Sequence, residues 1–362
     1  MKLLLYLFYP LSLLYQFLFW WQQKETTSFT LPNVLVISVG NLTVGGTGKT
    51  PFVQYLVRFF KQTCPGYAIT ILSRGYKAEK SKEGAILTDG RSPNLYGDEP
   101  SQHKEMFPDV QVIIGRNRKK SFLLHNQIQS KKHIVILDDG FQHKALHRDF
   151  DFVLLDANSP LGNGFTLPLG LLREPADHIK RANAILFTKI TNQNKTGLLK
   201  YNSELKKIVP HVPIYFSQFE SSVVELQIHN DLEQIPFIPQ LDSQYFLVTG
   251  VGNPKHVYET AKTTLLTDSI RTKFFPDHFE FNESVLSSLS KEILPDEILV
   301  TTEKDWIKLR THKDFQEDLK RKKTKVLLLL IQVSVTEENQ LKSMLAGLVS
   351  TYEVKNDLVS KT

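Results

Sequence analysis

The chain has 362 residues, 41% of them hydrophobic and 23% charged, which is ordinary for a globular protein and long enough for two domains. A single cysteine, Cys64, excludes an intramolecular disulfide framework, and no cluster of cysteine and histidine residues has the spacing of a zinc site. The formal net charge of +6 suits an anionic partner, which leaves nucleic acid, a phosphorylated substrate and an anionic membrane as the classes to distinguish.

The chain begins with an apolar segment. Residues 3–21 carry no charge, and only Ser12 and Gln16 are distinctly polar. As a helix this segment would span about 28 Å, close to the thickness of a hydrocarbon core. No small-x-small cleavage site follows, and the tryptophan pair at its end favours an interfacial anchor over a signal peptide. We predict that residues 1–24 form a membrane-anchoring helix, either spanning the bilayer or lying in its plane, with a buried core helix as the alternative.

A strand, a glycine-rich turn and a helix follow. Residues 34–39 are an apolar run of strand type, and Phe52, Leu56 and Phe60 recur at helical spacing after the turn. This is the context of a phosphate-binding loop (P-loop), in which backbone N–H groups surround phosphate oxygens and a lysine and a hydroxyl complete the site. The first glycine of the strict motif would fall on Thr43, so the match is a loosened one. The predicted nucleotide-binding residues are Gly45, Gly46, Thr47, Gly48, Lys49 and Thr50.

Further apolar runs recur along the chain, each ending in polar residues. Because these runs are continuous and do not alternate, they indicate strands buried on both faces, and the helix-length stretches between them favour a doubly wound, mainly parallel α/β sheet. Such sheets bind ligands at the carboxyl ends of their strands. The predicted strands are residues 68–72, 110–114, 134–137, 152–155 and 184–187.

One of these strands ends in two carboxylates. Residues 134–137 lead directly into Asp138 and Asp139, which is the Walker B form: a buried strand that delivers a carboxylate beside the P-loop. A carboxylate in this place holds Mg²⁺ directly or through water. We therefore predict an ATP and Mg²⁺ site formed by the P-loop and this strand.

The pattern changes beyond about residue 213, and a second set of strands follows at residues 245–248 and 298–301, with a longer one at 326–333. We predict a P-loop domain over residues 25–215, a smaller α/β domain with its linker strands over 216–335, and a C-terminal tail over 336–362.

Nine short motifs occur along the chain: VGNLTVGGTGKTP (39–51), SRGY (73–76), GDEP (97–100), GRNR (115–118), LDDGFQH (137–143), LPLGLLREP (167–175), FTK (187–189), FPDH (275–278) and TTEKD (301–305). Together they resemble the tetraacyldisaccharide 4′-kinase family, the lipid A 4′-kinases of Gram-negative envelope synthesis. The resemblance covers most of the chain, from the apolar N-terminus to about residue 309, and the family's relaxed P-loop accounts for Thr43.

The resemblance implies an activity: transfer of the γ-phosphoryl group of ATP to the 4′-hydroxyl of a tetraacyl glucosamine disaccharide 1-phosphate. It also implies a location at the cytoplasmic face of the inner membrane, with the lipid substrate held in the bilayer. Lys49 is expected to contact the β- and γ-phosphates, and Thr50 to bind Mg²⁺. Because the apolar segment precedes the first strand, we expect its removal to release the protein from membranes and to leave ATP binding intact.

The resemblance also assigns residues to the reaction. Asp98 matches the family's proposed catalytic base, and His278 matches the histidine that works with it, the two expected on different lobes. Asp138, Asp139 and Glu174 are expected near the metal. Each has a plain structural alternative, such as a turn-capping aspartate, a loop histidine or a salt-bridged scaffold residue.

Three other functions compete with this interpretation. A membrane-tethered switch ATPase of the MinD and ParA type needs a lysine where this chain has Val44. A GTPase would need an aspartate at Thr191 to recognise guanine, so ATP is preferred. A nucleic-acid-binding module is disfavoured because the basic residues are dispersed and carry no recognised binding signature.

Overall fold

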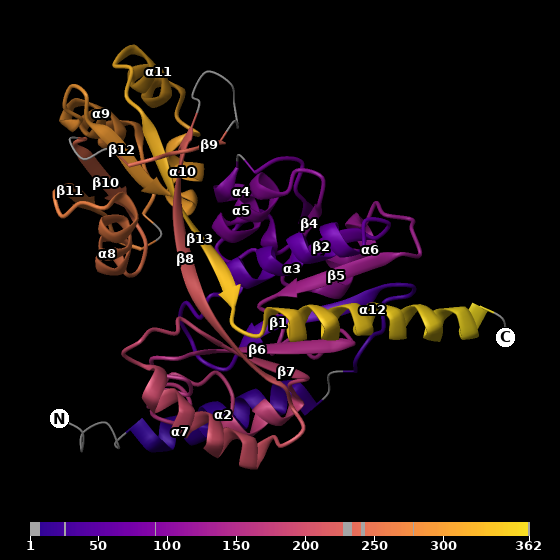
Figure 1. The fold of residues 1–362 in the computed structure, drawn as a ribbon. Coiled ribbons are helices and arrows are strands. Elements are labelled where there is room, and N and C mark those ends of the chain that lie inside the picture. Colours follow the sequence, from indigo (N-terminus) through magenta and orange to yellow (C-terminus); the bar gives the residue numbers. More distant parts are fainter. Residues whose placement is uncertain are drawn as a thin grey trace.

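The computed structural model describes residues 8–24, 27–90, 92–226, 234–239, 243–277 and 279–360. Among these residues, thirteen strands form one mixed sheet, in which nine strand pairs are parallel and three are antiparallel. The α/β fold with a mainly parallel sheet that the apolar runs predict is thereby confirmed. Figure 1 shows that the sheet carries two lobes joined by a pair of long strands.

The first lobe is the half of the sheet with the order β7-β6-β1-β5-β2-β4-β3. Its strands are β1 (Leu35–Asn41), β2 (Ala68–Ser73), β3 (Ala85–Ile86), β4 (Gln111–Ile114), β5 (His133–Asp138), β6 (Phe150–Asp156) and β7 (Ala184–Thr188). Its helices and 3₁₀ turns are α3 (Lys49–Thr63), η2 (Glu79–Ser81), α4 (Pro93–Tyr96), α5 (Asp98–Met106), α6 (Arg118–His125), η3 (Ala176–Arg181) and α7 (Lys195–Ile208).

The central strand β1 is buried on both faces because helices cover both. Leu35 and Ile37 point to the core that contains α3, whereas Val36, between them, points to the opposite core with Phe122 of α6. All residues of β1 are buried. This two-sided burial explains why the strand reads as a continuous apolar run.

The second lobe is the half with the order β11-β10-β12-β13. Its strands are β10 (Tyr245–Thr249), β11 (Ile270–Phe274), β12 (Ile298–Thr302) and β13 (Val326–Val335), and its helices are α8 (Pro254–Leu265), α9 (Glu283–Glu292), α10 (Glu303–Leu309) and α11 (Lys313–Arg321). Two separate apolar cores, one under α9 to α11 and one under α8, hold it together.

The long strands β8 (Ile214–Leu226) and β13 connect the lobes. They pair antiparallel over ten residue pairs, from Val326 with Leu226 to Val335 with Ser217, and the short strand β9 (Gln234–Pro236) pairs with the far end of β8. This ribbon runs from one lobe into the other in Figure 1. The longer strand predicted at residues 326–333 is therefore one of the two strands that connect the lobes.

Helix α2 (Tyr9–Lys24) precedes the sheet. The large hydrophobic side chain of the preceding residue, Phe8, is exposed, and so are eight on the helix itself: Tyr9, Leu11, Leu13, Leu14, Phe17, Leu18, Trp20 and Trp21. By contrast, Ser12 is buried. Over the described part of the chain, no helix is both long enough and apolar enough to cross a lipid bilayer.

The last residues that the structure describes form a helix that packs on the first lobe. Helix α12 (Glu338–Ser360) buries Leu341, Leu345 and Val349 in the same core as α3. Tyr67 donates a hydrogen bond to Glu353 at 2.9 Å. The segment predicted only as a tail therefore covers one face of the first lobe, as its position beside β1 in Figure 1 shows.

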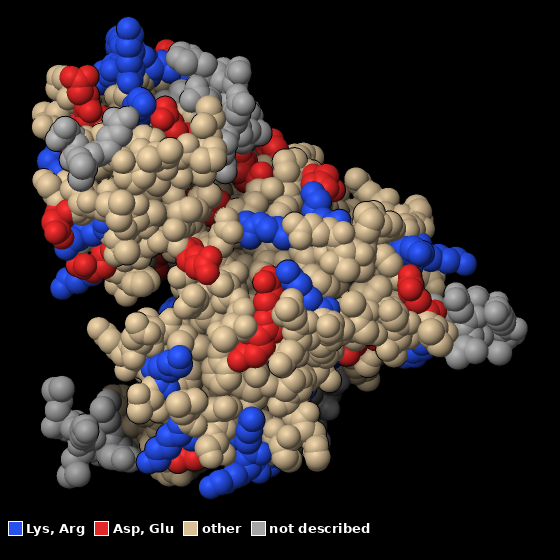
Figure 2. All heavy atoms as spheres, viewed as in Figure 1, with Lys and Arg blue, Asp and Glu red and all other residues tan. Residues whose placement is uncertain are grey.

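The surface carries both signs of charge. On the face in Figure 2, basic and acidic side chains are interspersed over both lobes, and the surface is indented between the lobes. The net positive charge is therefore spread over this face and does not form one patch.

Candidate active site

The glycine loop, residues 42–48, joins β1 to α3. Gly45 and Gly48 have φ angles of 113° and 81°, in the left-handed region that favours glycine. At Gly48 a side chain is also excluded by space, because a Cβ atom would lie 2.6 Å from the ring of Phe219. Gly45 and Gly46 are exposed and Thr50 is half-buried in the first turn of α3. Glycine is therefore favoured at positions 45 and 48 by the backbone conformation, and at position 48 also by the close approach of Phe219.

The loop is held from one side by β7 and the residue after it. Thr188 donates a hydrogen bond to the carbonyl of Thr47 at 2.9 Å, and the ammonium of Lys189 donates to the carbonyl of Gly46 at 2.5 Å. Lys189 also pairs with Asp156 at 2.5 Å. The carbonyls of Thr47 and Gly46 are therefore held by the end of β7, and the loop's N–H groups are the atoms that would bind an anion.

From the other side the loop is paired with residues 171–173. The N–H of Val44 donates to the carbonyl of Leu171 at 2.8 Å, and the N–H of Arg173 donates to the carbonyl of Leu42 at 2.7 Å. Thr43 and Leu172 form an antiparallel bridge between these two bonds. The shape of the glycine loop therefore depends on the segment that carries Arg173.

Lys49 lies at the centre of a charged cluster. Its Nζ atom is 3.5 Å from Oδ1 of Asp139 and 3.4 Å from Oδ1 of Asn41. Arg173 donates to both carboxylate oxygens of Asp139, at 3.0 and 2.8 Å. Burial by itself would raise the pKa of Asp139, but the positive charges of Lys49 and Arg173 outweigh it and hold that pKa well below its usual range. Asp139 is therefore ionised over the working pH range.

Asp138 lies beside the glycine loop because β5 pairs with β1, with Asp138 opposite Val39. Its side chain is 1% exposed, and its Oδ2 atom is 3.4 Å from Nε2 of His103. Among the described residues, its Oδ1 atom has no hydrogen-bond partner. A buried carboxylate oxygen without a donor is suited to a cation. The described residues contain no group of three or more histidine, cysteine or acidic side chains placed to hold a metal ion on their own.

Glu174 is fully buried in a hydrogen-bond network. One of its oxygens accepts from His178 at 2.8 Å and from Arg181 at 2.6 Å. The other accepts from Gln142 at 2.8 Å, and Gln142 also donates to the carbonyl of Asn41 at 2.7 Å. Glu174 thus links the segment after Arg173 to the end of β1. Its role as a metal ligand stays a prediction.

Asp98, at the start of α5, faces the second lobe. Its Oδ2 atom is 3.0 Å from the Nζ atom of Lys308 and 3.9 Å from that of Lys304, both on α10. Lys304 is also 3.6 Å from Asp277. His278 lies outside the described residues, so its pairing with Asp98 stays a prediction. The structure does bring Asp98 of the first lobe against a helix of the second.

Sequence reasoning did not identify Lys308 or Glu99 as site residues. Lys304 and Lys308 are four residues apart and so lie on one face of a helix, and this spacing is the feature of the sequence that could have identified the lysine pair. Glu99 follows Asp98 and keeps contact with solvent, but crowding by surrounding protein atoms raises its pKa, as does the negative charge of Asp138. Lys49 acts in the opposite direction, so Glu99 lies within electrostatic reach of the glycine loop.

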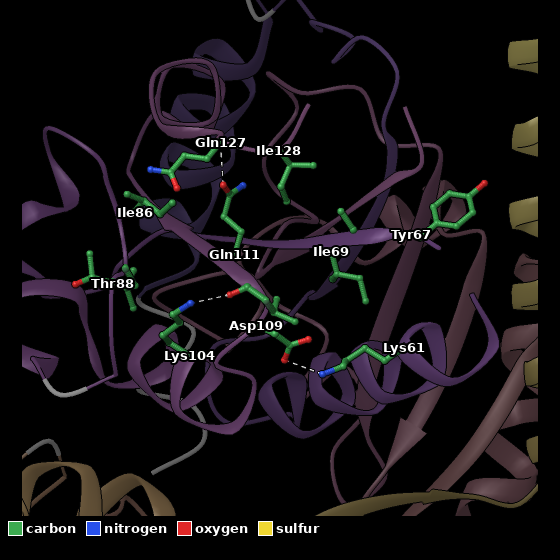
Figure 3. A pocket seen from close by; sticks show the side chains of 13 residues that line it. Lys61, Tyr67, Ile69, Ile86, Thr88, Lys104, Asp109, Gln111, Gln127 and Ile128 are labelled. Atoms are coloured by element: carbon green, nitrogen blue, oxygen red, sulfur yellow. Dashed lines mark hydrogen bonds and ion pairs between the residues drawn. The ribbon is translucent and has the colours of Figure 1, made fainter. Parts of the chain in front are cut away.

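A separate cavity of about 520 Å³ lies at the opposite edge of the first lobe, where β2 and β4 begin (Figure 3). Lys61 pairs there with Asp109 at 2.7 Å, and Lys104 donates to the carbonyls of Pro108 and Val110. Its charged groups are therefore already paired with protein atoms, in contrast to the Oδ1 atom of Asp138, which has no hydrogen-bond partner among the described residues.

Known proteins are similar in sequence to nearly the whole chain. Residues 4–350 match the family model described as tetraacyldisaccharide-1-P 4′-kinase. A tetraacyldisaccharide 4′-kinase of Leptospira biflexa is 59% identical over 372 aligned residues, with 99% of this chain and 100% of the relative covered. One from Syntrophobacter fumaroxidans is 37% identical, with 76% of this chain and 71% of the relative covered.

Among solved structures, the chain is similar to a crystal structure described as an apo form of LpxK from Aquifex aeolicus in complex with ATP. The TM-score is 0.71 at 29% sequence identity, and the similarity covers 96% of this chain and 99% of the other. Family match, close relatives and fold agree, and the chain belongs to the tetraacyldisaccharide-1-phosphate 4′-kinase family.

Proposed function

We propose that this family member transfers the γ-phosphoryl group of ATP to the 4′-hydroxyl of a tetraacyl disaccharide 1-phosphate, the reaction of lipid A synthesis. The observation that carries the proposal is the position of Lys49, which lies after a glycine loop of P-loop form and beside two adjacent carboxylates. Burial raises the pKa of Glu99 and the positive charge of Lys49 opposes the rise, which supports a location of the start of α5 near the loop. Family membership favours this kinase over a switch ATPase of the MinD type.

In this proposal the loop's N–H groups and Lys49 bind the β- and γ-phosphates and stabilise the negative charge that shifts during transfer. Asp139 and Arg173 fix the position of Lys49 before ATP arrives, because Asp139 is ionised and bonded to both cations. Lys49 can leave Asp139 for phosphate oxygens without moving its backbone. The preorganised cluster thereby contributes to the electrostatic stabilisation of the transition state.

Asp98 acts as the base that accepts the proton of the attacking hydroxyl. A sugar hydroxyl is a weak acid, so the carboxylate contributes late, as the proton leaves. Lys304 and Lys308 hold the carboxylate at the boundary of the lobes, with their ammonium groups 3.9 and 3.0 Å from its Oδ2 atom. Since they belong to the second lobe, the base is in place when the lobes are together.

Mg²⁺ fits the residues at this site. Asp138 offers a buried oxygen with no donor among the described residues, and Thr50 offers a hydroxyl in the first turn of α3. These are the hard oxygen ligands that Mg²⁺ prefers. Bound with ATP, the ion would neutralise charge on the phosphate oxygens. Asp139 and Glu174 already accept hydrogen bonds from protein donors, so we place them near the ion but not among its direct ligands.

The membrane contact is proposed to be an in-plane one at the cytoplasmic face of the inner membrane. The exposed aromatic and aliphatic side chains of α2 support it, since an amphipathic helix of this kind binds at the interface. A lipid substrate then keeps its acyl chains in the bilayer while its sugar headgroup reaches the site.

The test is label transfer from γ-labelled ATP to tetraacyl disaccharide 1-phosphate in mixed micelles. We expect label in the lipid with Mg²⁺ present and none after chelation by EDTA. Label that appears only as free phosphate would contradict the proposal and support a switch ATPase.

A further inference from the structure

The inner side of α2 makes polar contacts that an anchor does not need. Ser12 is 1% exposed, and its hydroxyl donates to the carbonyl of Thr166 at 3.0 Å and accepts from the N–H of Leu169 at 3.1 Å. Gln16 donates to the hydroxyl of Thr166 at 3.0 Å. A helix that served only to hold apolar residues in a membrane would have no reason to satisfy these loop atoms.

A third contact reaches the active site directly. The hydroxyl of Tyr15 donates to the carbonyl of Arg173 at 2.8 Å, while the N–H of Arg173 donates to Leu42 in the glycine loop at 2.7 Å. The side chain of Arg173 binds Asp139, which pairs with Lys49. The backbone of Arg173 is therefore fixed between α2 and the glycine loop, and burial raises the pKa of Tyr15, which keeps its hydroxyl protonated and able to donate.

We propose that Ser12, Tyr15 and Gln16 of α2 are positioning residues for the phosphoryl-transfer reaction. Through residues 166–173 they set the position of Arg173, and through Arg173 they set Asp139, Lys49 and the first half of the glycine loop. The helix that contacts the membrane by its outer side thus orders the nucleotide site by its inner side. This inference rests on the proposed kinase function.

One consequence concerns regulation by the membrane. On this proposal, a shift of α2, such as one caused by its seating on a bilayer, would move the carbonyl of Arg173, which Tyr15 holds, and would loosen the bridge between Thr43 and Leu172. Catalysis then depends on the membrane in two ways, through the concentration of lipid substrate and through the order of the site. Removal of the whole helix is expected to impair the nucleotide site, contrary to the expectation from sequence that ATP binding would be left intact.

The experiment compares three single variants by kcat, lipid KM and binding to anionic lipid vesicles. Tyr15→Phe removes only the hydroxyl, and we expect kcat to fall about three- to tenfold, as for one lost hydrogen bond. Lipid KM and vesicle binding should stay at the wild-type values. The matched control is Tyr9→Phe on the same helix, which keeps its edge-to-face contact with Phe165 and should leave kcat unchanged. Leu14→Ser, on the exposed side, should weaken vesicle binding and raise lipid KM.

A double variant separates positioning from general loss of structure. If Tyr15 acts through Arg173, Tyr15→Phe combined with Arg173→Lys should lower kcat little more than Arg173→Lys alone. Multiplied losses, or a wild-type kcat for Tyr15→Phe, would overturn the inference. Failure of the wild-type enzyme to phosphorylate the lipid would instead overturn the proposed function, so the two failures are distinguishable.

Discussion

Helix α3 carries a lysine–aspartate pair at each end, and the two pairs differ in what they do. Lys61, in the last turn, is 2.7 Å from Asp109, and both side chains are well exposed. Lys49, in the first turn, is 3.5 Å from Asp139, and its own side chain is only 11% exposed. The shorter pair is the one that water and salt can replace, so distance alone does not identify a functional pair.

The helix dipole sharpens the contrast. A cation in the last turn is favoured by the negative end of the dipole, whereas a cation at the N-terminus is opposed by the positive end. Lys61 therefore occupies the end that stability prefers. Lys49 occupies the opposite end, where a lysine is useful only if an anion such as phosphate binds, which is why the second pair marks the site.

The largest expected effect separates the two lysines. We expect Lys49→Ala to lower kcat about 10³-fold or more, since it removes one charge aimed at the transferring phosphoryl group. Lys61→Ala is the matched control on the same helix and should keep kcat within about twofold. Label transfer at saturating lipid and ATP measures both. Near-normal turnover by Lys49→Ala would remove the P-loop assignment.

The next effect concerns Asp98, whose pairing with Lys308 resembles a scaffold salt bridge as much as Lys61 with Asp109 does. If Asp98 is the base, Asp98→Ala should lower kcat about 10²-fold or more, with ATP affinity nearly unchanged. His278→Ala should behave alike, and the double variant should be little worse than the poorer single one. Fully additive losses would mean that the two residues work independently.

A third effect contrasts two half-buried carboxylates. Cations lower the pKa of Asp139, so it stabilises the fold at neutral pH and this contribution is lost as the pH falls. Burial raises the pKa of Glu303 to about 7, although hydrogen bonding from Gln102 works against the rise. At a pH between the unfolded and the folded pKa of Glu303, its carboxyl is protonated in the folded state and ionised in the unfolded state. The free energy of unfolding therefore decreases as the pH rises towards 7.

The variant Glu303→Gln tests this sign, because glutamine can still accept from Gln102. We expect it to be more stable than the wild type by about 1–2 kcal/mol at pH 8 and equal to it near pH 4.5. Thermal unfolding at both pH values measures the difference. An equal change at the two pH values would show that titration of Glu303 is not its cause.

The smallest effect is expected at the exposed end of α3. A double-mutant cycle of Lys61→Ala and Asp109→Ala should give a coupling of about 0.2–1 kcal/mol that fades in high salt. Urea unfolding at low and high salt is sufficient to measure it. A coupling of several kcal/mol would mean that the exposed pair supports the cavity beside it.

The sequence predicted the parts of the site that follow from local pattern. Residues 34–39 and 134–137 are apolar runs buried on both faces, and their pairing places Asp138 beside the glycine loop as expected. The contact of Lys308 with Asp98 was not predicted, because it joins two lobes that are far apart in sequence. Nothing in a local pattern specifies which helix faces meet across such a boundary.

The apolar N-terminus is a second place where local sequence pattern did not predict the tertiary contacts. Its exposed residues follow from composition, whereas the role of Ser12 depends on the loop carbonyl that it meets at Thr166. The segment after Val335 has no recognised motif, yet Leu341 and Leu345 complete a core of the first lobe. In both places tertiary contacts determined the outcome, and single-sequence periodicity does not report them.

The most direct test of the account is to locate the phosphate that the protein adds. Tetraacyl disaccharide 1-phosphate, ATP and the purified protein are incubated in mixed micelles, and the lipid product is analysed by phosphorus NMR and mass spectrometry. The account predicts one new phosphate monoester on the 4′-oxygen, formed in equal amount with ADP. ADP formed without a phosphorylated lipid, or a phosphate at any other position, would contradict it.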